Sequence, residues 1–225
     1  MQYKEILEFI KNNHNKKNVE GMARFGINCK NAYGVSIPKL RELAKKIGKN
    51  HDLAQRLWKT GIHEARILAG YVDDPLKVST SQMDQWVTDF DSWDICDQIC
   101  SSLFDKTHFS YKKTYEWVAS EEEYVKRAGY VMIAVLAVHD KKTSDKQIVK
   151  FLPVIIKGSK DERKFVKKAV NWALRQIGKR SRFLNEEALK TAQKILKIDS
   201  KAAKWIATDA IRELTDKKTV ARIKT

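Results

Sequence analysis

The sequence feature best suited to binding a ligand is a stripe of cations over residues 160–179. Apolar residues recur there at helical spacing, and beside the apolar face lie Lys164, Lys168, Arg175 and Lys179. Trp172 falls between that face and the stripe. In a nucleic-acid groove, cations hold phosphates and an aromatic ring meets a base or sugar. The alternative is a solvated Lys/Arg face with a partly buried tryptophan.

A second helical segment, 92–104, places an aromatic ring and a carboxylate on one flank. At about 100° per residue, the core stripe is Cys96, Ile99, Cys100 and Leu103. Trp93 lies at the edge of this stripe, and Asp97 follows one turn later on the same side. The alternative is that Trp93 packs at the core edge and Asp97 is a solvated acid. Asp94 points nearly opposite the core in the first turn, which predicts a structural role.

Arg127 opens an apolar helix expected over 122–138. An arginine there is either a surface residue that extends its head to water or a fixed fork for a phosphate.

All the segments that position the candidate functional residues are predicted to be helices. Glycine (9) and proline (3) are scarce, and no sustained alternation of apolar and polar residues predicts a strand. Ser36, Pro38 and Gly48 mark the start and end of one helix. We expect helices over residues 2–16, 18–27, 36–48, 51–59, 62–73, 79–90, 92–104, 106–118, 122–138, 144–157, 160–179, 184–197 and 199–216, with a kink at Pro153.

Short segments of similar sequence recur along the chain and indicate a structural repeat. Residues 124–128 resemble residues 165–169, and residues 169–173 resemble residues 202–206. The spacing between these similar segments is typical of the helix pairs in an α-solenoid of HEAT-like repeats. Such a solenoid exposes one helix of each pair along a concave surface. The predicted fold class is therefore all-α, with a single domain over 1–225.

The charge composition indicates which class of partner the protein binds. The net charge is +16, and residues 113–225 hold 27 basic and 14 acidic residues, so the excess of cations is concentrated in the second half. Such asymmetry favours a nucleic-acid partner over mere solubility. No long apolar run predicts a membrane helix, and no signal peptide is expected. Three cysteines without a CxxC spacing favour a reducing cytoplasm and argue against a metal site.

Five short motifs, in order over residues 20–180, resemble the AlkD-like DNA alkylation repair glycosylases. Residues 93–97 (WDICD) are similar to the family's W-D-x-x-D motif, and residues 168–175 (KAVNWALR) resemble its K-A-I-x-W-x-L-R helix. Residues 125–128, 22–25 and 33–38 resemble its Q/K-R-A, M-A-R-Y and G-I-x-x-P segments.

The resemblance implies a C-shaped stack of HEAT-like repeats that clasps duplex DNA. It implies excision of cationic 3-methyladenine and 7-methylguanine without metal or cofactor, and without a deep base pocket. Asp97 would be the catalytic carboxylate, Trp93 and Trp172 aromatic walls, and Arg127 a phosphate contact. The predicted DNA-binding set is Arg127, Lys164, Lys168, Arg175 and Lys179. We expect a cytoplasmic, nucleoid-associated monomer whose partner is duplex DNA with alkylated bases.

Some positions depart from the family pattern. Phe25 stands where tyrosine is frequent, Ile37 where a polar residue is common, and Ser92 where a second tryptophan precedes the motif. The competing hypotheses are a non-catalytic binder of bent or branched DNA and a HEAT-type scaffold for protein partners. One branch of the superfamily has lost the catalytic pair, whereas Trp93 and Asp97 are both present here.

Overall fold

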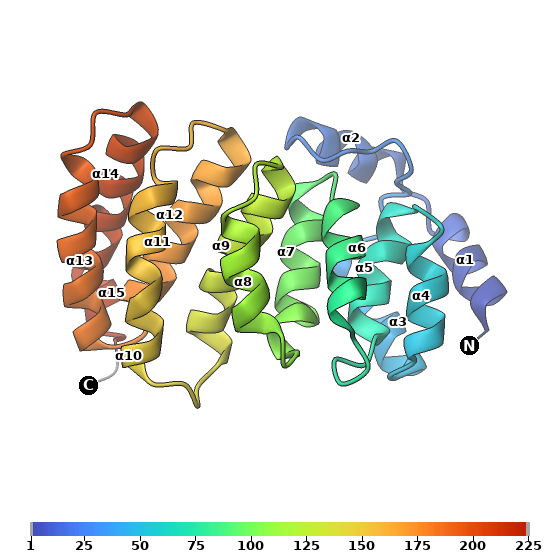
Figure 1. The fold of residues 1–225 in the computed structure, drawn as a ribbon. Coiled ribbons are helices and arrows are strands. Elements are labelled where there is room, and N and C mark those ends of the chain that lie inside the picture. The colour runs from blue at the N-terminus through green and yellow to red at the C-terminus, as the bar shows by residue number, and fades with distance from the viewer. Residues whose placement is uncertain (1, 224–225) are drawn as a thin grey trace. The chain divides into compact units, whose positions relative to one another are not determined.

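The structure is a computed structural model that describes residues 2–223. All regular secondary structure of these residues is helical, which confirms the all-α prediction (Figure 1). The chain divides into two compact units, Met1–Phe109 and Ser110–Thr225, and each is described by itself. The prediction of a single domain stays a prediction.

The first unit holds the helices that carry Trp93 and Asp97. The helices of this unit are α1 (Tyr3–Asn12), α2 (Lys16–Arg24), α3 (Ile37–Ile47), α4 (His51–Trp58), α5 (His63–Val72), α6 (Thr80–Thr88) and α7 (Trp93–Ser102), followed by the 3-10 turn η1 (Phe104–Lys106). The central helix is α5, which is buried along most of its length and packs against α3, α4 and α7. Trp58 of α4 and Trp86 of α6 stack with ring centroids 4.0 Å apart.

The second unit is a stack of helix pairs. Helix α9 (Glu123–His139) is apolar on nearly every side and packs against α8 (Ser110–Val118) and α12 (Lys164–Gly178). Helix α12 in turn packs against α13 (Arg182–Leu196) and α14 (Lys201–Thr215). The remaining elements are α10 (Asp145–Ile148), the 3-10 turn η2 (Val149–Phe151), α11 (Leu152–Gly158) and α15 (Lys217–Val220).

Polar residues at the helix starts explain where several helices begin. In six helices of the described residues the N-cap side chain accepts a backbone N–H of the first turn, and each such cap contributes about 1 kcal/mol: Asn15, Asn50, Ser79, Ser181, Ser200 and Asp216. Helix α3 begins after Ser36 with Pro38 in its first turn and ends at Gly48, as predicted.

One predicted helix is divided in the structure. The expected helix over 144–157 forms as α10, η2 and α11. Pro153 lies in the first turn of α11, where its missing N–H breaks no helical hydrogen bond. The backbone stays in the helical region across the boundaries of all three elements, and the 3-10 turn η2 directly precedes the helix that has Pro153 in its first turn.

No helix within residues 2–223 is long and apolar enough to span a membrane. In the same residues, no group of three or more His, Cys, Asp or Glu side chains could hold a metal ion.

Candidate functional site

The orientation of Trp93 is fixed by the segment that follows α2. The backbone N–H of Asn28 donates to the Ser92 hydroxyl (2.7 Å), and its side-chain amide donates to Asp91 (2.8 Å). These bonds hold the segment over the start of α7. The indole Nε1 of Trp93 then donates to the backbone carbonyl of Phe25 (3.1 Å). Trp93 remains partly exposed, so part of its ring is available for contact.

Trp93 lines a cavity of about 620 Å³ within the first unit, whose walls come from α2, α3, α5, α7 and the segment between α2 and α3. The lining includes two cations, Lys17 and Arg24, and the exposed ring of Phe25. Cations beside flat apolar surfaces suit a ligand that carries both phosphates and planar rings. Phe25, an aromatic residue that departs from the family pattern, is 71% exposed at this cavity.

Asp97 lies on α7 one turn after Trp93 and is partly exposed. It does not line the cavity described above. The core stripe of α7 is buried as the sequence predicts, with Cys96, Ile99 and Cys100 fully inside. Asp97 is thus kept out of the core by its helical register, and its catalytic role stays a prediction.

The structure corrects the expected orientation of Asp94. Asp94 does lie in the first turn of α7, but its carboxylate points inward and accepts a hydrogen bond from His63 Nε2 (2.8 Å). The side chain of His63 is only 5% exposed. Burial by itself lowers the pKa of His63, but the hydrogen bond to Asp94 and the charges of Asp94, Glu64 and Asp91 together raise it above the ordinary value.

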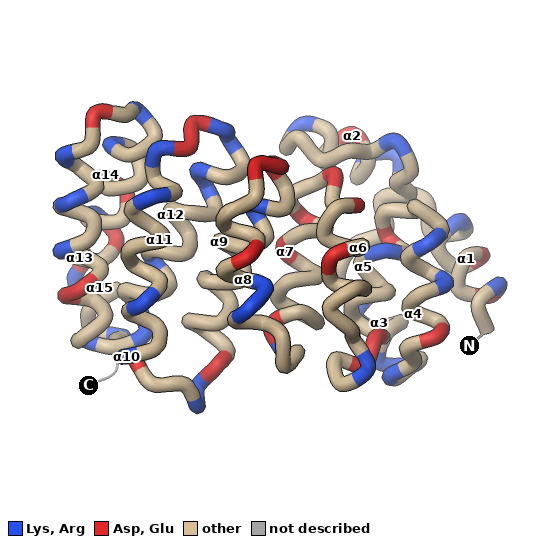
Figure 2. The backbone as a smooth tube through the Cα atoms, viewed as in Figure 1, with Lys and Arg blue, Asp and Glu red and all other residues tan. Residues whose placement is uncertain are grey.

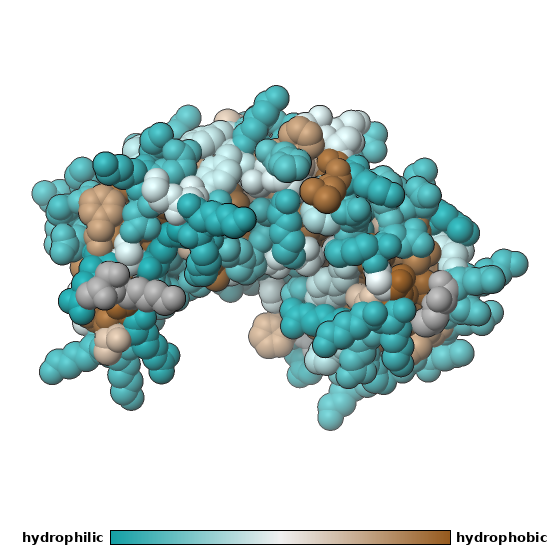
Figure 3. Space-filling view, turned by 90° about the horizontal axis from the view of Figure 1, so that it is seen from below, coloured by the Kyte–Doolittle hydropathy of each residue, from teal (hydrophilic) through white to brown (hydrophobic). Residues whose placement is uncertain are grey.

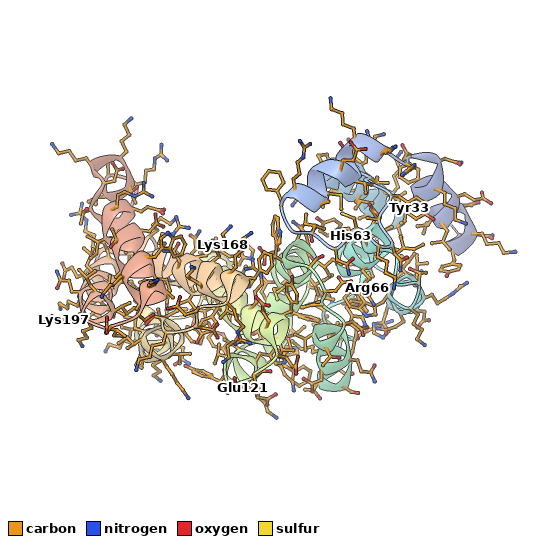
Figure 4. The ribbon with its side chains drawn as sticks, turned by 90° about the horizontal axis from the view of Figure 1, so that it is seen from above. Tyr33, His63, Arg66, Glu121, Lys168 and Lys197 are labelled. Atoms are coloured by element: carbon orange, nitrogen blue, oxygen red, sulfur yellow. The ribbon has the colours of Figure 1, made fainter. Side chains whose placement is uncertain are left out.

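A buried glutamate builds one wall of the cavity. The Glu64 carboxylate accepts backbone N–H groups from Tyr33 (3.0 Å), Gly34 (2.6 Å) and Val35 (3.3 Å). Gly34 has φ +73°, and a Cβ there would lie 2.4 Å from the carbonyl oxygen of Asn15. Only glycine fits this close approach, which explains why the 33–38 motif contains Gly34. Figure 4 shows Tyr33 and His63 beneath α2.

In the second unit, Arg127 is buried at the start of α9, with 5% of the residue exposed. Its guanidinium donates to the backbone carbonyl of Phe165 at the start of α12 (2.6 Å). The side chain therefore ties two adjacent helices together. Its predicted contact with a phosphate stays a prediction, and such a contact would use the small part of the group that is exposed.

The predicted cationic stripe divides into two halves. Lys164 and Lys168 are exposed, and Figure 4 shows Lys168 extending away from α12. Arg175 and Lys179 instead bind acids of α14: both donate to Glu213, and Arg175 lies 3.6 Å from Asp209. Burial alone would raise the pKa of Glu213, but these two donors lower it below its usual value. Trp172 is partly exposed between the two halves.

Several residues that shape the site carry no local sequence signal. Glu64, His63 and Glu213 act through partners about 30 or more positions away, and no spacing rule predicts such pairs. Figure 2 marks Lys and Arg in blue and Asp and Glu in red: α14 carries both kinds of charge, whereas the charged residues of α12 are all Lys or Arg.

Comparison with known proteins gives a family and a fold. The model of a family described as "DNA alkylation repair enzyme" matches residues 6–214. A solved structure described as "a new family of proteins related to the HEAT-like repeat DNA glycosylases with affinity for branched DNA structures" is similar to this chain with a TM-score of 0.78 and 22% identity, over 94% of this chain and 95% of that one. The likeness shows a HEAT-like repeat fold, as predicted.

Two further solved structures are less similar. An engineered protein has a TM-score of 0.39 at 13% identity, over 78% of this chain and 90% of its own. A designed armadillo repeat protein in complex with the peptide (KR)4 has a TM-score of 0.41 at 15% identity, over 82% of this chain and 78% of its own. Neither likeness bears on function. Among curated proteins, no match was found.

Proposed function

The chain belongs to the DNA alkylation repair enzyme family, and from that premise we propose that it excises cationic N3- and N7-alkylated purines from duplex DNA. The substrates are 3-methyladenine and 7-methylguanine, and the reaction is hydrolysis of the N-glycosidic bond. In this proposal the protein is a cytoplasmic, nucleoid-associated monomer that needs no metal or cofactor.

The observation that carries the proposal is the arrangement on α7. Trp93 is partly exposed, and its indole is held by the Phe25 carbonyl. Asp97 follows one turn later and stays outside the core. A flat aromatic face and a carboxylate on one flank are the two groups that a positively charged nucleotide requires.

The chemistry follows from the charge of the lesion. Alkylation at N3 or N7 gives the purine a formal positive charge, so the bond between C1′ and the base nitrogen is already weak. When this bond breaks, its electron pair goes to the base, which leaves neutral, and the sugar becomes an oxocarbenium-like cation. Water then bonds to C1′ and releases a proton to solvent. Asp97 stabilises the cationic sugar and positions the water.

The aromatic residues provide selectivity for charged lesions. An indole face attracts a cationic ring more than a neutral one, by about 0.5–2 kcal/mol. Trp93 supplies one such face, and the family resemblance assigns Trp172 the second. No hydrogen-bond readout of the base is needed, and no general acid is required because the base leaves uncharged.

Base release from damaged DNA tests the proposal. Duplex DNA methylated at purines is incubated with excess protein, and free bases are separated and quantified. We expect release of 3-methyladenine and 7-methylguanine, and no release of hypoxanthine from a matched duplex, since that base is uncharged. If no alkylated base is released at any excess of protein, the enzymatic proposal is wrong.

A second candidate function is binding of branched DNA without catalysis. The specific observation in its favour is the fold likeness to a protein whose description includes affinity for branched DNA. The cavity beside Phe25 and Trp93 offers cations and rings to an unpaired strand. This candidate predicts tighter binding to a four-way junction than to a linear duplex, with an affinity that the Asp97→Asn variant retains.

A further inference from the structure

Charge compensation along α12 and α14 is uneven. Toward the ends of both helices, each cation has an acid partner: Arg175 and Lys179 bind Glu213, and Arg212 binds Asp209. Toward the starts, Lys164, Lys167, Lys168 and Lys201 lie within 4 Å of no carboxylate among the described residues. An exposed anionic partner is therefore attracted to the first turns of these helices.

Glu162 lies near this cluster and reduces its charge only in part. The Glu162 carboxylate accepts the Ser200 hydroxyl (2.8 Å) and the Ala202 backbone N–H (3.0 Å). It is thus occupied in capping the start of α14, where an acid is favoured. The four lysines at the helix starts outnumber this one carboxylate, so the surface that they form keeps a net positive charge.

Trp205 is the aromatic member of this surface. It lies in the first turns of α14 and is 42% exposed, although tryptophan is usually mostly buried. The Lys167 ammonium lies 5.5 Å from the centre of the indole ring, which holds the ring against α12. The exposed part of the ring is available to a planar partner.

The register of the two helices places Trp205 among lysines. In the sequence, Trp205 repeats Trp172 after 33 residues, on the same helical face. In the structure, residues in contact across α12 and α14 are 34 to 38 positions apart in the sequence, so the residue opposite Trp205 lies before Trp172 in α12. Trp205 is therefore displaced by about one turn toward the helix starts, away from the compensated half of the stripe.

We propose that Trp205, with Lys164, Lys168 and Lys201, forms a further DNA contact in the second unit. The lysines hold phosphates of a strand, and the indole packs on a base or deoxyribose of the same strand. Lys164 and Lys168 are about 6 Å apart along the helix axis, close to the advance of two nucleotides along a DNA strand. An acidic protein segment would use the charges but gives no reason for an exposed indole.

The inference rests on the DNA partner of the proposed function, but not on its glycosylase chemistry. A binding experiment can therefore separate the two. Equilibrium affinity for an undamaged, fluorescently labelled duplex is measured by anisotropy for the wild-type full chain and three single variants: Trp205→Ala, Trp205→Phe and Lys201→Gln. Phe183→Ala is the matched control, because Phe183 is an aromatic residue of α13 with 47% exposure.

We expect Trp205→Ala to bind about tenfold more weakly and Trp205→Phe to recover most of the affinity. Lys201→Gln should reduce the slope of log affinity against log salt concentration by about 0.9, and Phe183→Ala should bind as the wild type does. Circular dichroism confirms that each variant is folded.

Two outcomes overturn the inference. One is equal duplex affinity for the wild type, Trp205→Ala and Lys201→Gln. The other is binding of poly-glutamate that weakens in Trp205→Ala as much as DNA binding does, which would assign the surface to acidic polymers in general. Either result can occur while alkylated bases are still released. Conversely, loss of DNA affinity in Trp205→Ala supports the inference even if no base is released.

Discussion

His63 is buried against Asp94, so its protonation is linked to the stability of the first unit. Because its pKa is raised in the folded state, the folded protein holds the proton more tightly than the unfolded chain does. The resulting stabilisation is fully present below about pH 6.5, the usual pKa of histidine. It is lost as the pH rises through the higher pKa of the folded protein.

Urea denaturation tests this linkage. We expect His63→Gln to lose about 1 kcal/mol more free energy of unfolding at pH 6 than at pH 9, because only the lower pH populates the charged hydrogen bond to Asp94. The exposed His108, replaced by glutamine, should show no such difference. A loss of equal size at both pH values would mean that His63 is not protonated in the folded protein.

Single residues also show where prediction from sequence ends. The side of α7 that holds Trp93 and Asp97 follows from helical periodicity, and both side chains are partly exposed as expected. The inward turn of Asp94 does not follow from it, since the partner His63 lies 31 positions away on α5. A periodicity argument places a residue on a face but does not identify its partner on another helix.

At the scale of elements, the entry to α3 depends on Gly34. Both Gly34 and Gly48 have positive φ, but a Cβ on Gly34 would collide with the Asn15 carbonyl, whereas a Cβ on Gly48 would have no atom within 4 Å. We expect Gly48→Ala to cost about 1 kcal/mol of unfolding free energy from backbone strain alone. Gly34→Ala should cost about 3 kcal/mol, because strain and collision add.

Thermal or urea unfolding of the two variants measures this difference. Gly48→Ala serves as the control for backbone conformation. Similar losses in both variants would show that the segment around Gly34 relaxes easily, and the cavity wall formed with Glu64 would then not be rigid.

Helix positions were largely predictable, and the pairing between helices was not. Most of the thirteen expected segments correspond to single helices, because apolar periodicity and caps are local features. The segment 144–157 is divided by the 3-10 turn η2, which lies just before Pro153, a residue with no backbone N–H to donate. The neutralisation of Arg175 and Lys179 depends on acids 34 to 38 positions later, in α14.

At the scale of the whole molecule, charge decides how binding responds to salt. Residues 110–225 hold 28 basic and 14 acidic residues, against 16 and 14 in residues 1–109. We expect the double variant Lys164→Gln/Lys168→Gln to lower the salt slope of duplex binding by about 1.8, since each lost phosphate contact removes about 0.9. Figure 3 shows a mostly hydrophilic surface on the face that it presents, with small hydrophobic patches.

The matched double variant is Arg175→Gln/Lys179→Gln. It should change the salt slope by less than 1, because these two cations already bind Glu213. Anisotropy titrations at several salt concentrations give both slopes. A larger loss of slope in the Arg175/Lys179 variant would show that DNA displaces Glu213 and that the whole stripe contacts phosphates.

The central claim is that Asp97 stabilises the cationic sugar during base excision. Its most direct test is the single-turnover rate of 7-methylguanine release from a duplex with one lesion, at saturating protein. We expect Asp97→Asn to be slower by about 10²–10³-fold with unchanged DNA affinity, while Asp94→Asn on the same helix, assayed where it is folded, keeps a rate within a few-fold of wild type. Release by Asp97→Asn at the wild-type rate would contradict the account.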